Sequence, residues 1–102
     1  MTNTVKCTSP IDGSVYIERP LATRDDALAA AARAKAAQPA WAARPLSDRI
    51  ALVRAAIAEV GKTQDRMALE LAHQMGRPVR YGGEFGGFNE RASHMADIAE
   101  TA

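Results

Sequence analysis

The sequence predicts a mainly helical chain of the α+β class, in which an N-terminal β-hairpin is followed by three to four helices. Three observations support this prediction. Alanine, the strongest helix former, accounts for 22 of the 102 residues. Beyond residue 22, apolar residues recur at the three- and four-residue spacings of a helix. Before that point, apolar and polar residues alternate beside a turn that contains proline and glycine, as in a short strand.

The hairpin is expected in the first segment, residues 1–22, with strands at about Thr4–Ser9 and Ser14–Arg19. Between them, Pro10 fixes its own φ and Gly13 accepts a positive φ, which favours a tight turn. A two-stranded hairpin is marginally stable in water by itself. We therefore expect this hairpin to need a packing partner.

The first helix is expected to begin after Thr23, which reads as an N-cap with Asp26 three residues later, the spacing of a capping box. It should run from Arg24 to about Gln38, where Pro39 stops or kinks it. Trp41 is expected in a short irregular turn after that point. There it would act as an anchor packed against a helix, in preference to a stacking platform for a ligand.

Two further helical stretches are expected in the middle of the chain. Ser47 is read as the N-cap of the first, and Gly61 ends or interrupts it. Thr63 is read as a cap for the continuation, which Gly76 and Pro78 stop. Each stretch carries one apolar stripe at helical spacing: Ile50, Val53, Ile57 and Val60 in the first, and Met67, Leu71 and Met75 in the second.

The last helix is expected from about Val79 to the end of the chain. The segment contains four glycines, which ordinarily favour a loop, but its apolar residues keep the helical period. Those residues are Phe85, Phe88, Ala92, Met95 and Ala99. We expect the helix to tolerate its glycines because another backbone lies close to them.

The apolar content is large in number but small in area. Hydrophobic residues make up 47% of the chain, yet only 18 residues are Leu, Ile, Val or Phe. Because buried apolar area stabilises a fold by about 25 cal/mol per Å², an alanine-rich chain gains little from its own core. We expect it to pack against something else.

Charge and cysteine usage exclude several classes. The 13 basic and 12 acidic residues are interspersed, which speaks against a nucleic-acid groove or an acidic-lipid surface. No apolar run approaches the roughly 18 residues of a membrane span, and the start of the chain lacks the apolar core of a secretory signal. Cys7 is the single cysteine, which favours a reducing compartment. The expected location is the cytoplasm.

Few residues suggest chemistry. The run from Gly82 to Gly87 does not have the spacing of a dinucleotide-binding loop, and a helix rather than a strand is expected before it. Cys7 has no histidine near it in sequence, so a partly buried strand residue is favoured over a nucleophile. His73 and His94 lie on different predicted helices without metal-ligand spacing, so surface or hydrogen-bonded histidines are favoured over ligands.

Two charged residues each allow two interpretations. Glu84 is either part of a solvated helix face or a buried carboxylate that anchors a neighbouring loop. Arg77 has the position to meet a phosphate, but an exposed loop arginine is the favoured interpretation.

The order of these signals resembles the amino-terminal part of the NAD(P)-dependent aldehyde dehydrogenases, from about residue 9 to residue 102. The matching features are the turn from Ser9-Pro10 to Gly13, Thr23-Arg24-Asp25-Asp26, the alanine-rich helix, Trp41-Ala42 with Pro45-Leu46-Ser47-Asp48-Arg49, Gly76-Arg77-Pro78 and Glu84. The resemblance implies an incomplete part of that fold, flanking the coenzyme domain and its contacts with other subunits. It also implies a full-length homo-oligomer that uses NAD or NADP to oxidise an aldehyde to an acid or acyl-CoA.

In the family, a cysteine thiolate attacks the aldehyde and a glutamate activates the deacylating water. Neither Cys7 nor Glu84 matches these groups, and no Rossmann loop is found, so we assign no catalytic, cofactor-binding or metal-binding residue. No glycine C-cap is found for the last helix before Ala102. We expect a single incomplete domain whose helical part is residues 23–102. The expected function is that of a fragment without activity alone, whose partner is the remainder of the enzyme or a second copy. The alternative is a free-standing helical interaction module.

Overall fold

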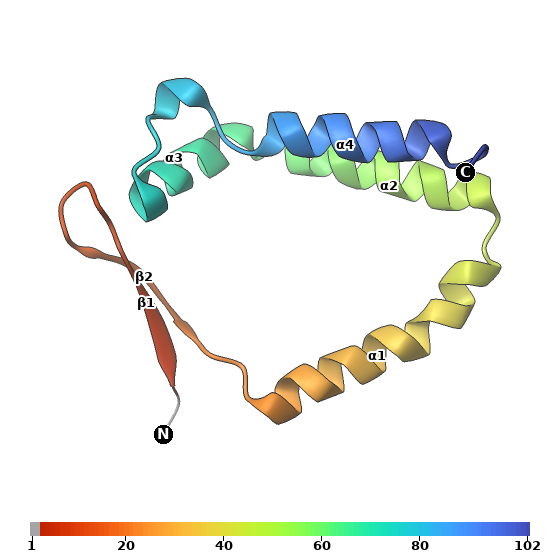
Figure 1. Cartoon of the computed structure of the whole chain (residues 1–102), viewed down its shortest axis with the longest axis horizontal. Coiled ribbons are helices and arrows are strands. Elements are labelled where there is room, and N and C mark those ends of the chain that lie inside the picture. The colour runs from red at the N-terminus through yellow and green to blue at the C-terminus, as the bar shows by residue number, and fades with distance from the viewer. Residues whose placement is uncertain (1–2) are drawn as a thin grey trace.

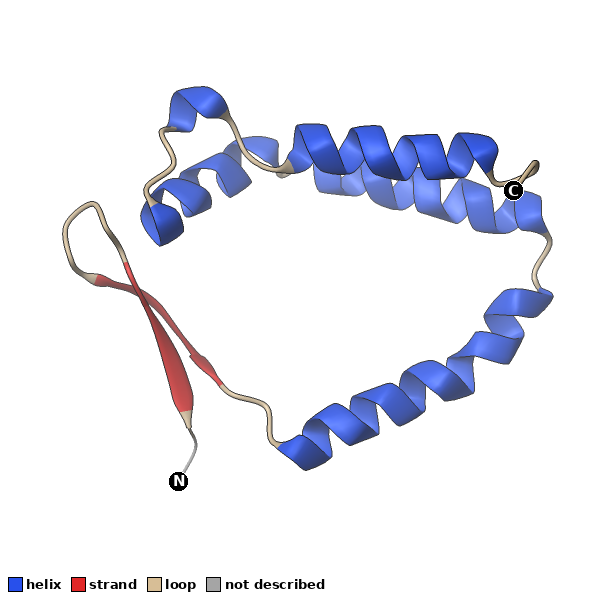
Figure 2. Cartoon of the chain, in the orientation of Figure 1, coloured by secondary structure: helices blue, strands red, loops and turns tan. Residues whose placement is uncertain are grey.

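The structure, a computed structural model, describes residues 3–102. An antiparallel hairpin comes first, followed by four α-helices and one short 3-10 helix, so the predicted fold class is confirmed (Figures 1 and 2). The elements are β1 (Thr4–Thr8), β2 (Val15–Pro20), α1 (Arg24–Ala43), α2 (Leu46–Gly61), α3 (Gln64–Met75), η1 (Val79–Tyr81) and α4 (Phe85–Ile98).

The elements form an open frame. Figure 1 shows α2 and α4 side by side along one edge, with α1 and the hairpin making the other two. The radius of gyration is 18.0 Å, whereas a compact domain of this length has about 13 Å. The exposed surface is 7974 Å², about 2,400 Å² more than the roughly 5,600 Å² expected for a folded monomer of this mass. Much of the chain therefore lacks a covering layer.

The core is small and lies in two places, between α2 and α4 and on the face of α3 that meets η1 and Gly83. The buried apolar residues are Ile57, Ala68, Ala72 and Ala96. Both predicted stripes are only partly covered, since Val53 is 38% exposed and Met75 57% exposed. Helix α1 has no buried residue at all.

The hairpin forms because its turn satisfies its own polar groups. The Ser9 N–H donates to the Ser14 carbonyl at 2.8 Å, and the Gly13 N–H donates to the Ser9 carbonyl at 2.9 Å. Gly13 adopts the expected positive φ of 76°. The Asp12 carboxylate accepts bonds from the Ser14 hydroxyl and N–H, which lower the pKa of Asp12. The strands match the prediction to within a residue at each end, apart from a register shift between Cys7 and Thr8.

Helix α1 continues through Pro39 and ends at Ala43, so the prediction that the helix stops near Gln38 is wrong. Trp41 is a helical residue, not part of an irregular turn. Proline removes one backbone donor, but the alanines around it are strong helix formers and the helix resumes. The C-cap residue, Arg44, is extended because Pro45 follows it.

The predicted boundaries of α2 and α3 are partly right. Gly61 ends α2, and Gly76 stops α3 with a left-handed φ of 79°. Ser47 is not the N-cap: Pro45 takes that position, and its carbonyl accepts the N–H groups of Asp48 and Arg49. Proline supplies no capping side chain, and helical geometry has already begun when Ser47 is reached.

Thr63 occupies the N-cap position of α3, but its side chain does not cap that helix. Its hydroxyl donates to the Val60 carbonyl at 2.7 Å, which lies in the last turn of α2. A threonine hydroxyl can bond a carbonyl one turn earlier in place of an N–H ahead of it. The residue therefore ties the two helices together at their junction.

The last helix begins at Phe85, so the expected start at about Val79 is wrong. Residues Val79–Tyr81 form the 3-10 helix η1, and Gly82 then breaks it with a φ of 69°. Helix α4 runs back along α2 in the opposite direction (Figure 1). The Phe85 ring closes this pair by lying against Gly61.

The capping box of α1 generates a pH prediction. Asp26 accepts bonds from the Thr23 N–H and hydroxyl at 2.9 and 2.8 Å, and the Asp26 N–H donates back to Thr23 Oγ1 at 3.1 Å. The bonds from Thr23 lower the pKa of Asp26 from its ordinary value of 3.8. A lowered pKa means that the stabilisation is present above this ordinary value and is lost as the pH falls through the folded pKa. Far-UV circular dichroism should show helix loss in this acid range, and Asp26→Asn should abolish the contribution.

A pair of glycine substitutions tests the backbone assignments. An alanine at Gly76 would sit in left-handed geometry with its Cβ 3.2 Å from Pro10, so Gly76→Ala should destabilise the fold by about 1–2 kcal/mol. Nothing lies within 4 Å of a Cβ at Gly87, and Gly87→Ala should stabilise α4 by about 0.5–1 kcal/mol. Thermal denaturation of both variants checks the opposite signs. Equal effects would contradict the assignments.

Candidate functional site

The residues with chemical potential lie on different elements, Cys7 on β1, His73 on α3 and His94 on α4. Cys7 on β1 is half-buried, with its Sγ 3.9 Å from the Gln74 carbonyl of α3. His94 is exposed on α4. Residues 3–102 contain no group of three or more His, Cys, Asp or Glu side chains that could hold a metal ion. Among residues 3–102, the hydrogen bond of the Cys7 thiol goes to a backbone carbonyl and not to a histidine or a carboxylate.

His73 has a contact that the sequence did not indicate. Its ring stacks on Tyr16 of β2, with the ring centroids 4.9 Å apart and the planes 5° from parallel. Stacked aromatic rings contribute about 0.5–1.5 kcal/mol beyond the area they bury. The pair joins the hairpin to α3, so His73 is a packing residue and not a freely solvated one. The two residues are separated by the whole of α1 and α2, so no local pattern could have predicted it.

Glu84 is exposed, and the interpretation that it is a buried anchor is wrong. It forms an ion pair with Arg77, whose side chain is 30% exposed against 65% for Glu84. The pair spans the segment between α3 and α4. An exposed pair of this kind is worth about 0–1 kcal/mol, so it positions the loop without stabilising the fold much. The favoured interpretation of Arg77 as an exposed loop residue is therefore wrong. Its side chain is half-buried and paired with Glu84.

The glycine cluster is only partly explained by close packing. Gly83 lies against α3, where an added Cβ would be 3.3 Å from the Ala68 nitrogen. Gly82, Gly86 and Gly87 have nothing within 4 Å of such an atom, so the expectation of a close backbone is wrong for them. The cluster follows the 3-10 helix η1 and not a strand. These residues therefore do not fit a dinucleotide, whose pyrophosphate needs a strand–turn–helix cradle.

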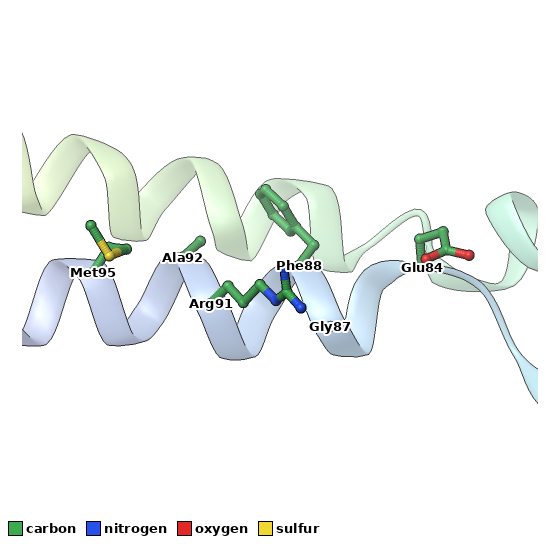
Figure 3. A pocket seen from close by; sticks show the side chains of 6 residues that line it. All are labelled: Glu84, Gly87, Phe88, Arg91, Ala92 and Met95. Atoms are coloured by element: carbon green, nitrogen blue, oxygen red, sulfur yellow. The ribbon is translucent and has the colours of Figure 1, made fainter.

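An open hollow of about 630 Å³ runs along α4. Figure 3 shows its lining side chains projecting from this one helix, with Glu84 just before its first turn. Two of them are large and exposed, Phe88 at 45% and Met95 at 63%. Arg91 adds a single positive charge. This surface suits contact with apolar side chains and contains no pair of groups for acid–base chemistry.

A second hollow lies between α2 and α4 and is called here the α2–α4 groove. It has a volume of about 370 Å³ and is lined by Trp41, Leu46, Arg49, Ile50, Val53, Ala92, Met95, Ala96 and Ala99. Trp41 thus reaches the α2–α4 pair from the end of α1, and it is 37% exposed. The groove is apolar except for Arg49, whose Nε is buried without a hydrogen-bond partner. Its chemistry is that of a binding surface.

Comparison with known proteins gives two matches. The sequence profile described as the aldehyde dehydrogenase family matches residues 1–101. The N-succinylglutamate 5-semialdehyde dehydrogenase of Novosphingobium aromaticivorans is 48% identical over 48 residues. That alignment covers 47% of this chain and 10% of the relative. No solved structure matches. Within the part of the chain that the structure describes, no helix combines the length and the apolar character that a bilayer crossing requires.

The stacked pair between hairpin and α3 generates a prediction. Tyr16→Ala should remove the contact with His73 and release the hairpin, at a cost of about 0.5–1.5 kcal/mol. Amide hydrogen exchange should then accelerate over β1 and β2. Tyr81→Ala is the matched control, because Tyr81 is 67% exposed and lies outside this contact. Unchanged hairpin protection in Tyr16→Ala would show that the stack does not hold the hairpin.

Proposed function

This chain belongs to the aldehyde dehydrogenase family, and we propose that it serves as the N-terminal segment of such an enzyme, docking onto a catalytic remainder and inactive alone. In this proposal the hairpin segment is residues 1–22, of which the structure describes 3–22, and the helical part is residues 23–102. The complete enzyme is proposed to use NAD or NADP to oxidise an aldehyde to an acid or acyl-CoA. Its proposed location is the cytoplasm, and its proposed assembly a homo-oligomer.

The observation that carries this proposal is the uncovered surface. The chain exposes 7974 Å², and α1 buries none of its residues. A helix in a protein gains most of its stability from the packing of one face against other elements. The exposed helix α1 and the α2–α4 groove are therefore surfaces that another part of an aldehyde dehydrogenase could cover. The remainder of the enzyme supplies what covers it.

The chain's own residues give a binding role and no chemical step. The Cys7 thiol donates to the Gln74 carbonyl, and no hydrogen bond of the described residues joins it to a base that would activate a thiolate. Glu84 is held in an ion pair with Arg77. The glycine cluster does not fit a dinucleotide, so no step of hydride transfer is assigned to these residues.

Complementation tests the proposal. The Novosphingobium relative, made without the segment that corresponds to this chain, is called here the truncated dehydrogenase. Neither this chain nor the truncated dehydrogenase should reduce NAD or NADP with N-succinylglutamate 5-semialdehyde, the aldehyde that the relative's name gives. Their mixture should bind and regain turnover, followed by absorbance of the reduced coenzyme. Absence of both binding and turnover would contradict the proposal.

Matched variants of a core residue sharpen this test. Ile57 is 7% exposed, and Ile57→Asp buries a charge that should disrupt the α2–α4 pair and abolish recovery. Ile57→Val removes one methylene at a cost of about 0.5–1.5 kcal/mol and should retain most of it. Equal recovery with both variants would mean that the folded pair is not what docks.

A second candidate function is a free-standing interaction module that self-associates. It is favoured by the large apolar residues exposed on α4, Phe88 and Met95. In that case the isolated chain would sediment as a defined oligomer and melt cooperatively. A monomer with gradual melting favours the docking segment.

A further inference from the structure

The α2–α4 groove contains one polar atom whose bonding is incomplete. The Nε of Arg49 is buried and has no hydrogen-bond partner among residues 3–102. No ion pair of the described residues includes Arg49, and the acid that pairs across the two helices, Asp97, is engaged by Arg54 at 2.6 Å. A buried donor without a partner destabilises the protein because it has lost its hydrogen bonds to water, and the loss is larger when the donor is charged. Arg49 is therefore a lining residue of the groove whose Nε lacks a hydrogen-bond acceptor.

The walls around Arg49 are apolar and incompletely covered. Trp41, Val53 and Met95 line the groove and are 37%, 38% and 63% exposed. Tryptophan and arginine are the residue types that most often carry binding energy at interfaces. An occupant with an apolar side chain gains by covering these residues, and a carboxylate beside it would satisfy the guanidinium.

We propose that the α2–α4 groove receives a segment of the catalytic remainder of an aldehyde dehydrogenase, which places an apolar side chain against Trp41 and Met95 and a carboxylate on Arg49. This inference rests on the proposed function and names the docking surface and the chemistry of the docking segment. Arg49 acts here as the polar anchor of an otherwise apolar contact.

The area to be covered favours the remainder over a second copy. A standard interface buries about 800 Å² on each partner, which would leave about two thirds of the surplus 2,400 Å² exposed. A second copy also brings the same small set of large apolar residues, 18 Leu, Ile, Val and Phe in all. A larger body covers both the groove and α1.

The test measures binding of this chain to the truncated dehydrogenase by isothermal titration calorimetry. Arg49→Met keeps side-chain length but removes the charge, and should raise the Kd about thirtyfold or more, as loss of a buried charge partner does. The free chain should keep its helix content, because the variant removes an unsatisfied donor. Met95→Asp offers Arg49 a carboxylate within the chain and repels the incoming one, so it should weaken binding as well.

Arg66→Met is the matched control. Arg66 lies on α3 outside the groove, is 71% exposed and is 3.8 Å from Glu70. Arg66→Met removes one positive charge, as Arg49→Met does. The Kd of the Arg66→Met chain should stay within about twofold of that of the unaltered chain. A hybrid enzyme, in which this chain replaces the corresponding segment of the relative, gives a second readout. Its Tm should fall with Arg49→Met and not with Arg66→Met.

The outcomes separate the two proposals. No binding and no recovered turnover by the unaltered chain would overturn the proposed function, and this inference with it. Binding that Arg49→Met and Met95→Asp leave unchanged would overturn the groove alone. A dimer of the isolated chain that both variants dissolve would assign the groove to a second copy and also overturn the inference.

Discussion

The packing of α2 against α4 is the contact on which the rest of the structure depends. It buries Ile57 and Ala96, and the Arg54–Asp97 ion pair links the two helices across their exposed side. The Phe85 ring lies against Gly61 at the end of the pair, where a larger residue would collide with it. Small side chains let the helices approach, but they also limit the apolar area that this contact removes from water.

The other elements attach to this pair with decreasing strength. Helix α3 is joined to the end of α2 through Thr63, and its Ala68 lies against Gly83 in the loop before α4. The hairpin meets α3 through the Tyr16–His73 stack and the approach of Pro10 to Gly76. Helix α1 buries nothing. This gradient follows from composition, because alanine forms helices readily but offers little apolar area to bury.

Local signals explain what was predictable. The Pro10–Gly13 turn, the Thr23–Asp26 capping box and the Gly76 stop each depend on residues within one turn of each other, and the structure contains all three. Where two local signals compete, sequence alone does not decide the winner. Helix propensity prevailed over Pro39 in α1. The broken backbone at Gly82 prevented the helix from starting near Val79, and α4 begins at Phe85, the first residue of the apolar period.

The candidate surface was less predictable, since it depends on distant partners. The stripe on α2 indicated an apolar face, but only the fold places Ala92 and Met95 opposite it. The missing acceptor of Arg49 cannot be read from its neighbours in sequence, and neither can the pairing of Glu84 with Arg77.

The isolation of α1 has a geometric consequence. Its 20 residues separate the hairpin from the α2–α4 pair by about 30 Å, and each residue advances the helix by about 100°. The hairpin at the other end is held against α3 by the Tyr16–His73 stack, so one inserted residue would turn it through that angle and break this contact. Seven inserted residues would restore its facing but displace it by about 10 Å. The length of α1 is therefore fixed at both of its ends, by the hairpin packed on α3 and by Trp41 at the α2–α4 groove.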